Sequence, residues 1–350
     1  MSETRAMPVM RLRRPQFPLL LAGGFMLLGL AALAALAIGA VSLSPAEVIA
    51  VLTGQAAEAR HEAIVLHLRL PRLLVAGLVG AALGLSGAVM QGLFRNPLAD
   101  PTLIGVSAGA TLAAASTIVA AGWLFPAGWQ PLLQPLFAFL GGLAVILVVY
   151  RFALVEGVTL VSMLLLAGIA FNAIAMSGTG FLIFIANDTQ LRDISFWTLG
   201  SVGGSQWVTV AVLAPFAAAP LLALPWLARA LDALNLGERE AGHLGFRVER
   251  VKRLACLCTA LAVGGAVAVS GTIGFVGLVV PHLVRLLAGP QHRTLMPLSA
   301  LLGAALLILA DLVARVIVAP AELPIGLITC LIGAPFFLAL LLRARSGFAA

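Results

Sequence analysis

The chain has 350 residues, of which 61% are hydrophobic and only 10% are charged. A soluble domain carries about a quarter charged residues, so this composition excludes a water-soluble globular fold. A formal net charge of +7 is compatible with a nucleic-acid binder as well as with a membrane protein. Because the basic residues sort by the side of a membrane, as described below, we expect a protein of the lipid bilayer that binds no nucleic acid.

Apolar runs of about 20 residues recur along the chain, and this is the length of α-helix that crosses the hydrocarbon of a bilayer. We therefore predict an all-α polytopic membrane protein, folded as one transmembrane domain over residues 1–350. About ten transmembrane helices are expected, near residues 17–40, 73–93, 102–122, 131–151, 159–185, 207–229, 251–270, 273–289, 297–318 and 324–343. The first run is too long for the core of a secretory signal, so it is interpreted as a span.

The distribution of basic residues predicts the orientation of these spans. Of the 21 lysines and arginines, the outer side would hold only Arg60, Arg69, Arg72, Arg192 and Arg315 if the N-terminus is cytoplasmic. Cytoplasmic segments of membrane proteins carry the excess of basic residues. Both termini are therefore expected in the cytoplasm, with residues 1–16 as a cytoplasmic N-terminal segment.

Two segments between the spans should form short helices on the periplasmic side. In the segment 41–68, Ser44-Pro45-Ala46-Glu47 fits a capping box and predicts a helix that ends near Gly54. Residues 186–206 are expected to form a second short helix, with Trp197 as an aromatic anchor at the membrane interface.

The cytoplasmic segment 230–250 contains the first indication of function. Gly237 should separate two short helices, of which the second runs from about Glu238 to Leu244 and ends at Gly245. Because apolar and charged residues alternate here, the segment is either a helix lying on its own bundle or a docking knob for a cytoplasmic partner. The sequence has no phosphate-binding loop of the GxxxxGK[ST] type, so energy from ATP would have to come from a separate protein.

Five motifs carry a close resemblance to a known family. They are Arg69-Leu-Pro-Arg72, the run from Gly87 to Gly109, Leu236-Gly-Glu238, the run from Gly274 to His282, and Ala321-Glu-Leu-Pro-Ile-Gly326. In this order they resemble the permease subunits of ATP-binding-cassette (ABC) importers for ferric siderophores, haem and cobalamin, from about residue 68 to residue 343. The resemblance implies the permease fold of type II importers and a location in the bacterial inner membrane.

The resemblance also implies the partners of the chain. A second copy would complete a homodimer around a central pathway, with two cytoplasmic ATPase subunits below it and a periplasmic binding protein above it. The chain itself would be a transport subunit and not an enzyme, with no catalytic residue, no metal ligand and no covalently bound cofactor. ATP and Mg²⁺ would be used by the ATPase subunits.

Two groups of residues match functional positions of the family. Coupling to the ATPase is implied for Leu236, Gly237, Glu238, Ala241, Leu244 and Gly245. Docking of the binding protein is implied for Arg69, Arg72 and Arg315. Alternatives remain open, because Arg315 could pair with Asp311 one helical turn earlier. Arg69 and Arg72 could extend to lipid headgroups.

The choice of substrate depends on the fifth span and the helix after it. The segment from Asp188 to Ser201 resembles haem permeases most, although cobalamin permeases carry a similar Leu-Arg pair. In a dimer, two copies of Arg192 could bind the two propionates of a haem, or Arg192 could pair locally with Asp188 or Asp193. The pathway is expected to be lined by Arg192, Met163, Leu166, Phe171 and Met176, although lipid-facing residues show the same helical spacing. Haem is the expected substrate, with ferric siderophores and cobalamin as alternatives.

Asp311 is the only acidic residue deep within an expected span, and such a charge is a functional candidate. An ion-coupled secondary transporter would need a carboxylate of this kind, which gives a distant alternative function. Arg315 lies on the same helix face and favours a structural ion pair instead.

Overall fold

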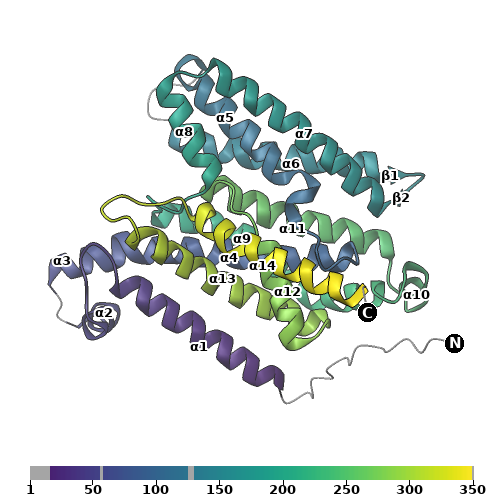
Figure 1. The fold of residues 1–350 in the computed structure, drawn as a ribbon, viewed down its shortest axis with the longest axis horizontal. Coiled ribbons are helices and arrows are strands. Elements are labelled where there is room, and N and C mark those ends of the chain that lie inside the picture. The colour runs from purple at the N-terminus through teal and green to yellow at the C-terminus, as the bar shows by residue number, and fades with distance from the viewer. Residues whose placement is uncertain (1–15, 56–57, 125–129, 349–350) are drawn as a thin grey trace.

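The structure is a computed structural model that describes residues 16–55, 58–124 and 130–348, and most of them are helical (Figure 1). In chain order, the elements are α1 (Gln16–Ala37), α2 (Pro45–Leu52), α3 (Ala59–Glu62), η1 (Ala63–Arg69), α4 (Leu70–Leu93), η2 (Pro101–Ile104), α5 (Val106–Leu124), α6 (Gln130–Ala153), β1 (Leu154–Val155), β2 (Val158–Thr159), α7 (Val161–Ile185), α8 (Asp188–Leu199), α9 (Trp207–Leu234), α10 (Glu238–His243), α11 (Val248–Ser270), α12 (Val276–Ala288), α13 (His292–Val316) and α14 (Ile325–Phe348). Here η1 is a π-helix, η2 is a 3₁₀ helix, and β1 and β2 form one antiparallel hairpin. The predicted all-α fold is confirmed, whereas the predicted segment 1–16 lies outside the described residues except for Gln16.

Each predicted span coincides with a helix of the structure. Seven of the described helical segments are long and apolar enough to cross a membrane by themselves, and they contain α1, α4, α6, α7, α9, α11 and α13. Three further apolar helices are shorter, at Val106–Ala120, Val276–Ala288 and Ile325–Leu340. The polytopic architecture is therefore confirmed, and the count of ten spans is approximate.

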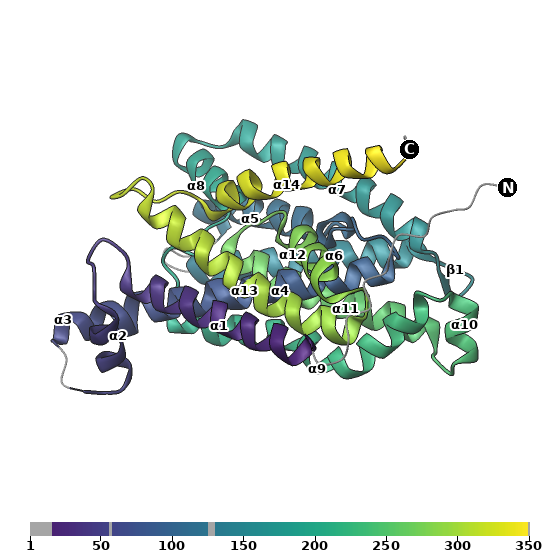
Figure 2. The same ribbon diagram turned by 60° about the horizontal axis from the view of Figure 1, so that its bottom comes forward.

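Helix α4 is the centre of the bundle, where it packs against α9, α11, α12 and α13. Helix α1 lies along α13 at the edge of the bundle (Figure 1). Helices α5, α6 and α7 pack on one another as a second layer, and this layer meets the first mainly through α11 (Figures 1 and 2). The chain thus consists of a core around α4 and a peripheral layer that contains α7.

Glycines bring the central helices into contact through their backbones. A Cβ atom at Gly80 would collide with the carbonyl group of Gly303 on α13, and one at Gly84 would collide with the carbonyl of Ser299. Gly87 approaches the backbone of α12 in the same way. Small residues of this kind are what allow membrane helices to pack without an intervening layer of side chains.

The short elements lie at the two ends of the bundle (Figures 1 and 2). Helices α2, α3 and α8 are at one end, which is called the outer end below. The hairpin and α10 are at the opposite, inner end, together with the first residues of α1 and the last residues of α14. This is the arrangement expected if both termini are cytoplasmic and the segments 41–68 and 186–206 are periplasmic.

Both short helices predicted for the outer end are present, and each begins with a capping box. At α2, Glu47 accepts a hydrogen bond from the backbone N–H of Ser44 at 2.7 Å, and the N–H of Glu47 donates to the Ser44 hydroxyl at 3.3 Å. These bonds lower the pKa of the Glu47 carboxyl. At α8, Asn187 and Gln190 form the same reciprocal pair at 2.9 and 3.1 Å. Local sequence is sufficient to specify both helix starts.

The inner segment 230–250 differs from the prediction in one respect. Helix α9 continues without a break to Leu234, so residues up to that point are the end of a long helix and not a separate short one. Leu227 and Leu231 are fully buried and extend the apolar face of α9 along the bundle. This packing outweighs the local polar residues. The second short helix exists as α10 and begins at Glu238 as predicted.

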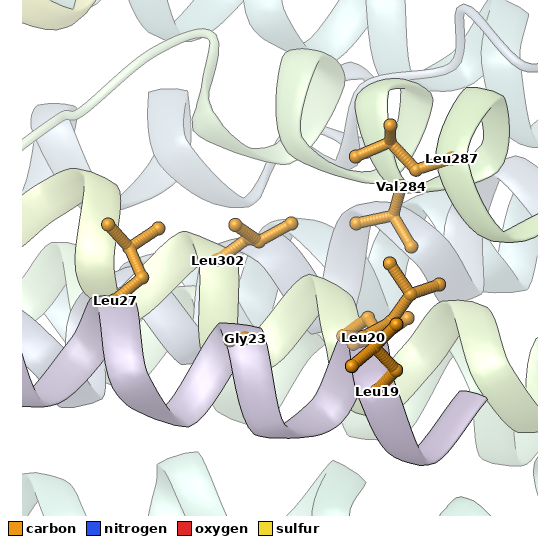
Figure 3. Close-up of a pocket in the computed structure, with 9 residues that line it drawn as sticks. Leu19, Leu20, Gly23, Leu27, Val284, Leu287 and Leu302 are labelled. Carbon is orange, nitrogen blue, oxygen red and sulfur yellow. The ribbon is translucent and has the colours of Figure 1, made fainter. Parts of the chain in front are cut away.

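A small groove of about 230 Å³ lies between α1, α12 and α13 (Figure 3). Its lining consists of aliphatic side chains and glycine, namely Leu19, Leu20, Gly23, Gly24, Leu27, Val284, Leu287, Leu298 and Leu302. Ligand sites combine apolar walls with a few placed polar groups, and the lining of this groove has no polar side chain. We therefore place the functional surfaces elsewhere, at the two ends of the bundle and on α7 and α8.

Candidate functional site

Residues 236–245, which contain helix α10, form a short protrusion at the inner end of the bundle, called the knob below. It begins after Gly237, whose φ of 134° favours glycine, and the chain turns again at Gly245 with a φ of 87°. Ala241 is fully buried against the bundle, whereas Leu236 and Leu244 on either side are 69% and 60% exposed. The knob is therefore anchored on one side and presents two leucines to its surroundings on the other.

A cavity of about 720 Å³ adjoins the knob. It is lined by Arg229, Asp232, Ala233, Asn235, Leu236, Leu244, Phe246, Pro290, Gln291 and Arg293. Asp232 accepts a hydrogen bond from the backbone N–H of His292 at 2.8 Å and contacts its ring at 2.7 Å, which fixes the start of α13 to the end of α9. Exposed apolar side chains beside a cavity are typical of a surface that binds another protein.

A buried lysine that the sequence analysis missed lies behind the knob. The side chain of Lys252 on α11 is 2% exposed and reaches Glu238, the first residue of α10, at 2.8 Å. It also donates to Glu249 at 3.1 Å and to the carbonyl of Thr159 in the hairpin at 2.7 Å. One carboxylate oxygen of Glu238 is thus bound to a buried group, although the side chain is 38% exposed. The spacing of Glu249 and Lys252, three residues apart on one helix, is the signal that could have revealed part of this network.

At the outer end, a cluster of charges joins α4, α13 and the segment before α14. Both oxygens of Asp311 bind Arg72 of α4, with distances of 2.8 to 3.1 Å, and Arg72 also binds Glu322 at 2.8 Å. Arg315 lies one turn from Asp311 and forms an ion pair with it at 3.2 Å, without hydrogen-bond alignment. The local pair expected for Arg315 is therefore present, and Arg72 is a second partner that the sequence did not indicate.

Arg69 binds backbone carbonyl groups of the same chain. It lies at the end of η1, is 7% exposed, and its guanidinium group donates to the carbonyls of Leu36, Ala37 and Val41 around the end of α1. A helix leaves its last carbonyl groups without intrahelical partners, and a guanidinium with five donors can satisfy them. Docking of a binding protein at Arg69 stays a prediction, and its guanidinium group is already engaged with the end of α1.

The outer cluster borders a cavity of about 950 Å³. Arg69, Arg72, Arg315 and Glu322 all contribute to its lining, together with residues 204–208 at the start of α9. The indole N–H of Trp207, one of the lining residues, donates to the carbonyl of Leu66 at 3.0 Å. Docking of a binding protein at Arg72 and Arg315 stays a prediction, since both charges are already balanced within the chain.

Helix α7 presents a largely uncovered apolar face. Met163, Leu166 and Met176 are exposed, as expected for residues that line a pathway or face lipid. Phe171 differs from them, because its ring packs against Phe152 of α6 with a centroid distance of 5.8 Å. Phe171 is therefore at least partly a packing residue, and it is the weakest of the predicted pathway positions.

Helix α8 crosses the outer end beyond α7 and exposes Arg192 (Figure 1). Its Ile194 is buried against α5, which fixes the helix to the bundle. Among the described residues, no ion pair joins Arg192 to Asp188 or Asp193. The local pairing considered for Arg192 is thus absent, and its charge remains available.

Comparison with known proteins assigns the chain to a family. The model of the FecCD transport family matches residues 27–343. The hemin transport system permease protein HmuU of Yersinia pestis is 46% identical over 284 residues, which cover 80% of this chain and 83% of that protein. The vitamin B12 import system permease protein BtuC of Escherichia coli O9:H4 (strain HS) is 42% identical over 291 residues, which cover 82% and 86%.

Solved structures agree with this assignment. One described as an inward-facing conformation of a metal-chelate type ABC transporter matches with a TM-score of 0.80 and 33% identity, over 93% of this chain and 99% of that one. The PsaBC structure from Streptococcus pneumoniae matches with a TM-score of 0.52 and 17% identity, over 85% and 95%, and supports the fold alone. The chain belongs to the FecCD transport family, and it is a multi-pass inner-membrane permease subunit of an ABC importer, which depends on separate ATPase subunits and a binding protein and is not itself an enzyme.

Proposed function

We propose that this permease is one half of a homodimer that passes haem from a periplasmic binding protein to the cytoplasm. The observation that carries the choice of substrate is Arg192, an unpaired cation exposed on α8 beyond the apolar face of α7. Two such cations in a dimer match the two carboxylates of haem, and α7 offers a surface for its apolar ring system. The similarity to the hemin permease HmuU, at 46% identity against 42% for BtuC, supports the same choice.

The homodimer is supported by the incomplete burial of α7. Only 17% of the most apolar part of this helix is buried inside the chain, the same share as for α9, compared with 72% for the span Ala59–Leu93 that contains α4. Lipid would cover such a face in a simple membrane anchor. In an importer, a second copy facing α7 would enclose a passage whose methionine and leucine walls bind haem weakly enough to release it.

The knob at α10 is the proposed contact for the ATPase subunit. Its rigid attachment through Ala241 and its exposed Leu236 and Leu244 support this role, because a short anchored helix can transmit a movement without being deformed. The double variant Leu236→Arg/Leu244→Arg should abolish co-purification of the ATPase, whereas Leu52→Arg at an exposed position of α2 should not. Full binding of the ATPase by the double variant would refute the assignment.

The substrate is tested on the importer reconstituted with its binding protein and ATPase. Haem-loaded binding protein should stimulate ATP hydrolysis more than the same protein exposed to cobalamin or to a ferric siderophore. Arg192→Glu should lower haem uptake by about tenfold or more while the ATPase remains bound, since like charges would then face the propionates. Arg60→Glu at an exposed outer position is the control. Full haem uptake by Arg192→Glu would show that Arg192 does not line the pathway. Stimulation of ATP hydrolysis only by the binding protein exposed to cobalamin would show that cobalamin, and not haem, is the substrate.

The alternative of an ion-coupled transporter receives no support from the geometry of Asp311. A proton relay needs a carboxylate that can take up and release a proton. Both oxygens of Asp311 are held by Arg72, and Arg315 adds a second positive charge at 3.2 Å. Asp311 is therefore fully engaged in ion pairs within the chain, and we assign it a structural role.

A further inference from the structure

The ammonium group of Lys252 joins α10 and α11 to Thr159 of the hairpin, which lies 93 positions earlier in the chain. It has three hydrogens, and three oxygens lie within reach: the carbonyl of Thr159 at 2.7 Å, a carboxylate oxygen of Glu238 at 2.8 Å and one of Glu249 at 3.1 Å. A protonated amine has three donors and no acceptor, so these contacts use its full hydrogen-bonding capacity. Because the side chain is 2% exposed, water screens the contacts only weakly.

Thr159 is the point at which this network reaches α7. Its backbone N–H donates to Glu249 at 2.9 Å, its carbonyl accepts from Lys252, and its hydroxyl lies 3.0 Å from that of Tyr150 on α6. The residue is fully buried, and Val161 two positions later is the first residue of α7. A displacement of Thr159 therefore displaces the first turn of α7.

Glu238 is the point at which the network reaches α10. It is the first residue of that helix, and its second carboxylate oxygen lies 3.9 Å from Arg95 beyond the end of α4. Helix α10 packs on α9 and α11, and β2 also packs on α11. The start of α11, which carries Lys252, thus lies between the knob and the hairpin at the inner end (Figures 1 and 2).

We propose that Lys252 is a positioning residue of the transport cycle, which links α10 to α7 so that both move as one unit. This inference rests on the proposed role of α10 as the ATPase contact. Without the ammonium group, Glu238 and Glu249 would repel each other and Thr159 would lose the bond to its carbonyl. Movement of α10 would then no longer carry the hairpin, and ATP hydrolysis would drive α7 inefficiently.

The test uses the complete importer in proteoliposomes, with its ATPase and binding protein. Lys252→Met removes the charge and keeps an apolar stem of similar length. The ATPase should still co-purify and hydrolyse ATP, while the amount of haem imported per ATP should fall roughly 5- to 30-fold. Arg253→Met removes the same charge from the exposed neighbour on α11 and should stay within about twofold of the wild type. A ratio of import to hydrolysis within about twofold of the wild type for Lys252→Met would overturn the proposal.

A purely structural role of Lys252 is separated by a second variant. Lys252→Met leaves two carboxylates without their main counter-charge, which should also lower thermal stability. The double variant Lys252→Met/Glu238→Gln removes one of these carboxylates, so it should regain stability but not the import per ATP. Recovery of both quantities would mean that Lys252 acts through stability alone, and the proposal would fall.

Spin labels give a readout that does not depend on transport. The labels are attached to cysteines introduced at Val155 of the hairpin and Arg239 of α10, both exposed, after the three native cysteines are replaced by alanine. The distance between the labels should keep one narrow distribution through the ATP cycle in the parent protein and should broaden with Lys252→Met. An equally narrow distribution in the variant would contradict the link. Failure of the underlying role of α10 is recognised separately, as full ATPase binding by Leu236→Arg/Leu244→Arg.

Discussion

Removing one partner of the buried ion pair between Arg72 and Asp311 should destabilise the outer end. Asp311 is 3% exposed on its side chain, and Arg72 binds both of its oxygens. Asp311→Leu removes these acceptors and leaves Arg72 and Arg315 as neighbouring positive charges. The remaining counter-charge is Glu322, which is 47% exposed and therefore compensates them only in part. We expect a clear loss of stability.

The size of this loss follows from the geometry. Removing one partner of a buried ion pair costs about 3–5 kcal/mol, because the other charge is left uncompensated. Arg72 retains its contact with Glu322 at 2.8 Å, which places the expected cost of Asp311→Leu at the lower end, about 3 kcal/mol. Replacing both partners by apolar residues of similar volume is often close to neutral. The double variant Asp311→Leu/Arg72→Met should therefore be more stable than Asp311→Leu alone.

The assay is a double-mutant cycle on the purified permease in detergent, followed by thermal and denaturant unfolding. An interaction energy of about 2 kcal/mol between Arg72 and Asp311 is expected, within the range of directly contacting residues. Glu322→Gln should change the stability by less than about 1 kcal/mol, since exposed pairs contribute little. Strictly additive losses for Arg72→Met and Asp311→Leu would show that the two side chains do not depend on each other, and the assignment of a buried pair would be refuted.

Two further predictions concern the packing and capping of helices. Gly80→Ala should lower stability by about 1–3 kcal/mol, because its Cβ would meet the carbonyl of Gly303, whereas Gly29→Ala in open space on α1 should be neutral or stabilising in the same melting experiment. Asn187→Ala should cost about 1 kcal/mol and increase hydrogen exchange in the first turn of α8, and unchanged exchange at Gln190 would contradict the capping box.

The sequence was sufficient for features that depend on neighbouring residues. The spans follow from runs of apolar residues, and the starts of α2 and α8 follow from Ser44 with Glu47 and from Asn187 with Gln190. The ion pair of Arg315 with Asp311 was also accessible, because one helical turn separates the two residues. The two helix starts and the ion pair are each set by contacts within about four positions along the chain.

Features that depend on distant residues were missed. Arg72 and Asp311 are 239 positions apart, and no local pattern connects them. Lys252 lies among several basic residues at the inner end of a span, where an exposed location is the usual expectation. Its burial became visible only when the hairpin at Thr159 and the start of α10 were placed around it. The carbonyl partners of Arg69 were missed for the same reason, since they belong to the end of α1.

The placement of buried charges indicates which part of the permease moves. Among the described residues, the buried lysine, arginine and aspartate side chains are Lys252 at the inner end and Arg69 and Asp311 at the outer end. Between these ends, α4 and α13 are in backbone contact at their glycines, and close packing of this kind restricts movement of one helix relative to the other. Among the described residues, the layer of α5, α6 and α7 has no backbone contact of this kind with α4 or α13 and meets the core mainly through α11. Movement of α10 should therefore displace α7 relative to the core of α4 and α13. The start of α11 lies between α10 and the hairpin and transmits this movement.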